Sequence, residues 1–199
     1  YGFLCPRFSL PRDGEMTAYT GLVTLVQLSA CVLGDKNKMS YDAGISYIRN
    51  VLEATRTLQK NPDDLDARGI IMLGASLSTS SRIGIGKEEP FAYDIYELEF
   101  LPEKLFGSTY RRSLTSIFPR FLAVMGRHHA AEVEKYCRDA FGFGSSIKES
   151  SRKLIELFSG FGAEMYFDGK ITREQVDSIP CRTELTPNEV FELMNSLIR

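Results

Sequence analysis

The chain has 199 residues, of which 43% are hydrophobic and 25% are charged, and its formal net charge is -2. This length supports one substantial core, and the ordinary composition leaves no long polar tract that would favour disorder. The near-neutral charge does not provide the basic surface that attracts a phosphate backbone, so we expect no nucleic-acid partner.

Residues 1–16 are expected to form an extended opening segment, and the residues after it follow the apolar period of packed helices. The longest apolar run, residues 21–34, is too short to span a bilayer and predicts a buried helix and no membrane partner. Three further apolar stripes are formed by Tyr41, Ile45, Ile48 and Leu52, by Leu154, Leu157, Phe158 and Phe161, and by Val190, Leu193, Met194 and Leu197. We therefore expect an all-α, multi-helix fold with eight or nine helices in a single domain, residues 1–199.

Capping residues mark where several of these helices begin. Asn61 before Pro62 predicts one helix start, and three capping boxes are predicted by the pairs Ser146 and Glu149, Thr172 and Gln175, and Thr186 and Glu189. The connections between the helices are short, as is typical of helices packed within one domain.

The four cysteines, Cys5, Cys31, Cys137 and Cys181, are too widely spaced for a CxxC pair. They predict reduced thiols rather than a zinc or redox site. No signal peptide is visible, which favours a cytoplasmic protein, and the opening YGFLCPRF lacks a methionine, which favours a piece of a longer parent.

Four motifs imitate functional sites. FDGKIT has Glu164, Tyr166 and Gln175 where a calcium loop needs other ligands, and GIGK lacks the spacing of a phosphate loop, so we read it as a turn with a terminal lysine. His128 and His129 are adjacent and point to different sides of a helix, which predicts ordinary side chains rather than a metal pair. A serine nucleophile among Ser78, Ser80 and Ser81 lacks a GxSxG elbow.

Several stretches together resemble the C-terminal helical domain of iron-containing alcohol dehydrogenases, in the branch of butanol dehydrogenases and broad-range aldehyde reductases. They are PRFSL, TAYTGLVTLVQLSACVL, DARGIIMLGASLSTSSRIGIGKEEPFAYDIYELE, SLTSIFPRFL, SGFGAEMYFDGKITREQVDSI and LTPNEVFELMNSLIR, which cover nearly the whole chain. The resemblance implies a dehydroquinate synthase-like helical fold. For the family it also implies an oxidoreductase that uses a divalent metal, iron or zinc, and NAD(P).

The resemblance also implies where the family's metal ligands, one Asp and three His, fall in this chain. The Asp and the first His match Val23 and Gln27, or Thr24 and Leu28 if the register shifts by one residue. None of these four side chains is an ordinary metal ligand.

The remaining family positions, which include a further active-site His, fall on Asp94 or Tyr96, on Leu98 or Phe100, and on Tyr110. Only Asp94 suits a hard cation, because Glu97 and Glu99 project at different angles around a helix. One carboxylate cannot replace four ligands. We therefore expect no bound metal, with apolar and aromatic groups filling the former site.

The family holds its nicotinamide cofactor mainly on an N-terminal α/β domain with a glycine-rich loop, and this chain shows neither alternating strands nor such a loop. We expect no NAD(P) binding by the chain alone, and a nucleotide-binding domain as its partner in a longer parent. A homo-oligomer is also compatible with the sequence.

Three functions remain open. The chain is a catalytically silent relative with a structural or interaction role, or it belongs to an active oxidoreductase with a changed metal site in a longer parent. The third is a helical module that binds a small apolar or phenolic ligand between Tyr96, Phe100 and Tyr110.

Overall fold

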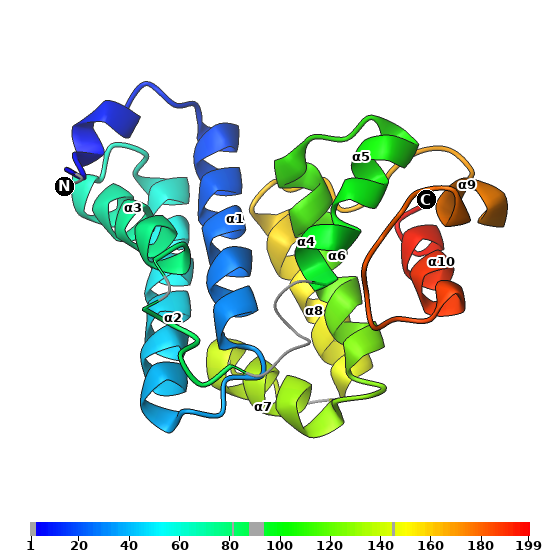
Figure 1. Cartoon of the computed structure of the whole chain (residues 1–199). Helices are drawn as coiled ribbons and strands as arrows, with labels where there is room; N and C mark the ends of the chain where they lie inside the picture. Colours follow the sequence, from blue (N-terminus) through cyan, green and yellow to red (C-terminus); the bar gives the residue numbers. More distant parts are fainter. Residues whose placement is uncertain (1–2, 81, 88–93, 145) are drawn as a thin grey trace. The chain divides into compact units, whose positions relative to one another are not determined.

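The computed structural model describes residues 3–80, 82–87, 94–144 and 146–199 (Figure 1). These ranges contain helices and two isolated β-bridges but no strand, so the predicted all-α fold is confirmed. The chain divides into two compact units, Tyr1–Glu88 and Glu89–Arg199, which we call unit 1 and unit 2. That the two form a single domain stays a prediction.

Unit 1 consists of a short 3-10 helix, η1 (Pro6–Ser9), followed by α1 (Gly14–Val32), α2 (Lys38–Lys60) and α3 (Leu65–Ser78). The opening segment is therefore not extended throughout, because η1 lies within it and α1 begins before residue 16. Pro6 fixes the backbone at the start of η1, and the Asp13 carboxylate caps α1 by accepting from the Met16 amide at 2.7 Å.

Helix α1 is the most buried element of unit 1, because α2 and α3 both pack against it (Figure 1). Its apolar residues are not confined to one stripe, and Leu22, Leu25 and Val26 are all fully buried. The predicted α2 stripe is also confirmed, with Ile48 fully buried at its centre. A helix that is apolar around most of its circumference requires a neighbour on more than one side.

The start of α3 differs from the prediction. Asn61 ends α2, and the side chain of Asp64 caps α3 by accepting from the Ala67 amide at 2.9 Å. Asn61 and Asp64 are both good capping residues, so composition alone does not choose between them.

Unit 2 contains seven helices over its described residues: α4 (Asp94–Leu98), α5 (Phe100–Phe106), α6 (Tyr110–Met125), α7 (Ala130–Phe141), α8 (Ile147–Gly160), α9 (Arg173–Asp177) and α10 (Pro187–Asn195). The described chain thus has ten α-helices, where eight or nine were predicted. Helices α4 and α9 have five residues each, which is too short to display an apolar period.

Helix α6 is central in unit 2 and contacts α4, α5, α7, α8 and α10 (Figure 1). Phe118 of α6 lies edge-on to Tyr136 of α7, with ring centroids 6.4 Å apart, and stacks at 6.3 Å on Phe158 of α8. These three rings are fully buried and join three helices in one core.

The predicted capping boxes at Thr172 and Thr186 are both present. At the third, Ser146 accepts from the Glu149 amide at 3.4 Å, but the Glu149 carboxylate instead binds the Arg152 guanidinium. The start of α8 is therefore confirmed as an N-cap, without the reciprocal half of the box.

Among the described residues, no helix is both long enough and apolar enough to cross a membrane.

The packing of α1 on α2 predicts that Gly21→Ala is destabilising. A Cβ atom at Gly21 would lie 2.3 Å from Thr55 Oγ1, and this buried hydroxyl donates to the Val51 carbonyl at 2.7 Å. We expect the free energy of unfolding to fall by about 1–3 kcal/mol, which exceeds the gain in helix propensity. Urea unfolding followed by circular dichroism measures the change.

The matched control is Gly160→Ala at the end of α8, because a Cβ atom there meets nothing within 4 Å. We expect this variant to unfold at the same urea concentration or a higher one. Equal losses of stability in the two variants would contradict a close approach of α1 and α2.

Candidate functional site

The α1 side chains at the positions expected to match family ligands are buried or half-buried in unit 1. Thr24 and Leu28 are 1% and 0% exposed, and Val23 and Gln27 are half-buried. A Cβ atom built at Gly74 of α3 would lie 3.1 Å from Thr24 Cγ2 and 3.6 Å from Leu28 Cδ1, so both side chains face α3. This segment offers hydrocarbon groups, one hydroxyl and one amide.

Gln27 is the most polar of these side chains, and its Oε1 accepts a hydrogen bond from Ser78 Oγ at 3.4 Å. Ser78 Oγ also lies 2.8 Å from the Ala75 carbonyl of its own helix. Ser80 likewise donates to Leu77 O at 2.9 Å, whereas Ser81 lies outside the described residues. These hydroxyls bond to neighbouring carbonyls as ordinary helix-end groups do.

The matching positions in unit 2 lie in different environments. Leu98 is fully buried, Tyr96 is half-buried, and Phe100 and Tyr110 expose 51% and 38% of their surface. Asp94 begins α4, and its side chain lies outside the part of the chain that the structure describes. Leu98 is therefore buried, as expected for an apolar group that fills the former site. The rings of Phe100 and Tyr110 are too exposed for that role.

Glu99, which the sequence predicts to be an unsuitable metal ligand, is a buried acid. It separates α4 from α5, is 3% exposed, and has a buried Oε2 without a hydrogen-bond partner among the described residues. Burial and the neighbouring Glu103 raise the pKa of Glu99 to about 8, so its carboxyl group is mainly protonated at neutral pH.

Among the matching positions whose side chains the structure describes, none carries a carboxylate or an imidazole. Across the described ranges, no group of three or more His, Cys, Asp or Glu is arranged to hold a metal ion. The described matching positions carry hydrocarbon, hydroxyl, phenol or amide groups, which are poor substitutes for imidazole and carboxylate.

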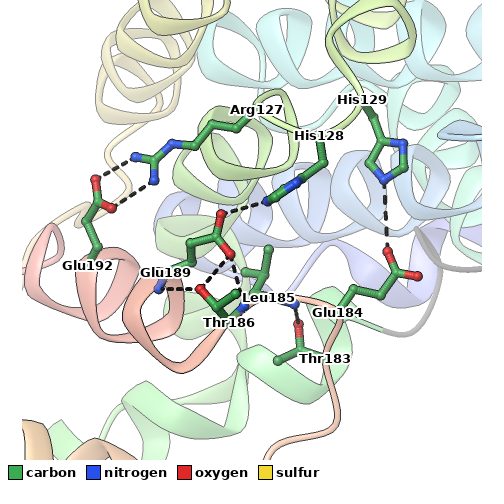
Figure 2. Close-up of polar contacts among 9 residues, drawn as sticks. All are labelled: Arg127, His128, His129, Thr183, Glu184, Leu185, Thr186, Glu189 and Glu192. Carbon is green, nitrogen blue, oxygen red and sulfur yellow. Dashed lines mark hydrogen bonds and ion pairs between the residues drawn. The ribbon is translucent and has the colours of Figure 1, made fainter.

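His128 and His129 each approach a different glutamate, and together with Arg127 they form a polar cluster at the turn between α6 and α7 (Figure 2). His128 Nε2 lies 2.6 Å from Glu189 Oε1, and His129 Nε2 lies 3.9 Å from Glu184 Oε2. The ring centroids are 6.5 Å apart. This geometry agrees with two separately placed side chains.

The partners of this cluster come from α10 and the segment before it (Figure 2). Arg127 makes two hydrogen bonds to the Glu192 carboxylate, at 2.8 and 2.5 Å. Glu189 accepts from the Thr186 amide at 2.9 Å as well as from His128, and these bonds lower the pKa of Glu189 to about 2. The cluster thus fastens α10 to the end of α6.

Lys87, which we read as the terminal lysine of a turn, is half-buried in unit 1. Its Nζ donates to the Ala30 carbonyl near the C-terminus of α1, and burial lowers the pKa of Lys87 to about 8, although Cys31 and Asp35 oppose the shift. Asp35 Oδ1 accepts from the Gly86 amide at 3.1 Å. These contacts fasten the turn to α1, which is a structural role.

The other sequence motifs also take structural roles. On α6, Arg112 pairs with Glu164 at 3.1 Å, and Arg120 is buried with its Nε bonded to the Ser196 carbonyl at 3.0 Å. The four cysteines are all free thiols, as predicted.

The fold matches solved structures at low sequence identity. NADH-dependent butanol dehydrogenase A from Thermotoga maritima is similar with a TM-score of 0.81 and 17% identity, over 98% of this chain and 55% of that chain. An iron-containing alcohol dehydrogenase from the same organism is similar with a TM-score of 0.70 and 14% identity, over 97% and 52%.

Sulfoacetaldehyde reductase from Bifidobacterium kashiwanohense, solved with NAD+, is similar with a TM-score of 0.75 and 14% identity, over 96% of this chain and 52% of that chain. No protein-family model and no curated protein sequence matches the chain. The chain thus has the fold of the C-terminal helical domain of iron-containing alcohol dehydrogenases and spans about half the length of these solved structures.

The polar cluster predicts the acid sensitivity of unit 2. The pKa of Glu189 is lower in the folded state than in the unfolded state, so its stabilisation is complete above about pH 4.5 and is lost as the pH falls through about 2. We expect Glu189→Gln to lower the free energy of unfolding at pH 7 by about 0.5–2 kcal/mol, because the capping carboxylate is lost. The variant should also lose less stability on acidification.

Urea unfolding at a series of pH values measures both effects. Glu134→Gln is the matched control, because Glu134 is an exposed glutamate on α7 in the same unit. If both variants show the same stability and the same pH dependence, Glu189 does not fasten α10.

Proposed function

We propose that the chain is the helical half of an alcohol-dehydrogenase-like protein and that it is catalytically silent as an isolated chain. The fold supports the first part, since the match to each compared structure covers nearly the whole of this chain and about half of that structure. The second part rests on the residues of α1, where Val23 or Thr24 and Gln27 or Leu28 stand at the positions of the family's Asp and first His.

The chemistry of these side chains decides whether the chain can hold the catalytic metal ion. A divalent ion gives up hydration water only for enough good donors, and neither register of α1 supplies a carboxylate or an imidazole. Asp94 alone leaves such an ion mainly hydrated and weakly held. Without a bound Lewis acid, the family's means of stabilising alkoxide charge is lost.

We assign the nicotinamide cofactor to a nucleotide-binding domain in a longer parent. The chain's described residues lack the parallel strands and the glycine-rich turn on which such domains hold a pyrophosphate. The helical half then has a structural or interaction role towards that domain.

A second candidate is an active oxidoreductase in a longer parent, rebuilt around a changed metal site. It is favoured by the carboxylate at Asp94, which stands at a family ligand position, and by the half-length match to structures of dehydrogenases.

Metal stoichiometry separates the two candidates. The chain is purified without chelator, supplied separately with iron, zinc or nickel, desalted, and measured by elemental mass spectrometry. We expect a ratio of metal to chain near zero for each ion. About one ion per chain, abolished by Asp94→Ala, would overturn the proposal and favour the second candidate.

Asp168→Ala is the control, because Asp168 is an exposed aspartate in the calcium-like FDGKIT segment. Circular dichroism of each variant verifies that it is folded. An ion that survives Asp94→Ala and is lost from Asp168→Ala is bound outside the family's positions, which leaves the proposal of a lost catalytic metal in place.

A further inference from the structure

Unit 1 contains a cavity of about 480 Å³ between the opening segment, α1, α2 and α3. Its apolar wall includes Phe8, Leu58, Ile71 and Met72. The volume lies within the range of about 300–1,000 Å³ that is usual for small-ligand sites. None of the positions that match a family metal ligand lines this cavity.

Arg68 of α3 lines this cavity and is 4% exposed. Its Nε donates to the Pro62 carbonyl at 2.7 Å, and its Nη1 donates to the Ser9 carbonyl and to Ser9 Oγ at 3.2 Å. All these acceptors are neutral, and within the described ranges no carboxylate pairs with this guanidinium. A buried cation without a counter-ion is costly, so Arg68 favours an anion beside it.

Arg12 adds a second positive charge to the same cavity. It is exposed, and its Nη1 donates to Thr20 Oγ1 at 2.9 Å. As with Arg68, the described part of the chain places no carboxylate within ion-pair distance of it. Neither aspartate nor glutamate is among the residues that line the cavity.

The threonine hydroxyl groups that line the cavity do not balance the positive charge of the two arginines. Thr17 Oγ1 donates to the Asp13 carbonyl at 2.8 Å, and Thr20 Oγ1 donates to the Met16 carbonyl at 2.7 Å. Their protons are therefore directed to backbone oxygens of α1 and its cap. Hydrogen bonds to a ligand come chiefly from the guanidinium groups, which match a carboxylate in shape and charge.

We propose that this cavity binds a medium-chain monocarboxylate, with its carboxylate at Arg68 and Arg12 and its alkyl chain along Phe8, Leu58 and Met72. The charge selects an anion, and the apolar wall selects a hydrocarbon chain, whose burial contributes roughly 25 cal/mol for each Å² removed from water. This inference goes beyond the proposed function and does not depend on whether the chain binds metal.

Isothermal titration calorimetry of the chain with octanoate tests the proposal. We expect saturable binding of about one octanoate per chain, and binding of 1-octanol and of acetate at least about tenfold weaker, because each lacks one of the two recognised groups. Arg12→Gln should weaken octanoate binding about tenfold and leave 1-octanol binding unchanged. Ala75→Phe, which fills the cavity, should abolish the binding of both.

Arg56→Gln is the matched control, since Arg56 is an exposed arginine of the same unit that does not line the cavity. Arg12 and Ala75 are chosen because loss of the buried Arg68 also removes structural hydrogen bonds. Absence of octanoate binding, equal affinity for octanoate and 1-octanol, or equal weakening by Arg12→Gln and Arg56→Gln would each overturn the proposal.

Discussion

The close packing of α1 against α2 and α3 is the constraint on which unit 1 depends. Gly21 allows α1 to approach Thr55 of α2, and Gly74 leaves room on α3 for Thr24 and Leu28. Once a helix is enclosed in this way, a polar or charged side chain on its inner faces must find a partner or destabilise the fold. Thr24 and Leu28, which face Gly74 of α3, therefore stand where packing favours uncharged side chains.

Unit 2 relies on buried rings around α6 and on charges at its periphery. The stacked and edge-on rings around Phe118 fix three helices, while the pairs Arg127 with Glu192 and His128 with Glu189 fasten α10. Glu99 is the exception, an acid in an apolar place whose raised pKa follows from burial. Structural contacts therefore explain most of the conspicuous charged residues of this unit.

The helical class and the long helices were predictable, because apolar period and capping are local properties of the sequence. The helix break at Glu99 and the start of α3 at Asp64 were not, because several neighbouring residues suit each boundary. The partners of Lys87 and Arg68 lie 57 and 59 residues away, and no local pattern indicates such contacts. The positions expected to match family ligands were predicted from the resemblance alone. The contact of Leu28 with α3 is seen only in the structure.

We infer that packing, rather than coordination, determines the residues of α1. It is tested most directly by the free energy of unfolding of Leu28→His, measured in urea with and without zinc. We predict a loss of about 2–5 kcal/mol, because a buried leucine is replaced by a polar ring, and no recovery with zinc. A variant that is as stable as the original chain, or that zinc stabilises, would contradict the claim.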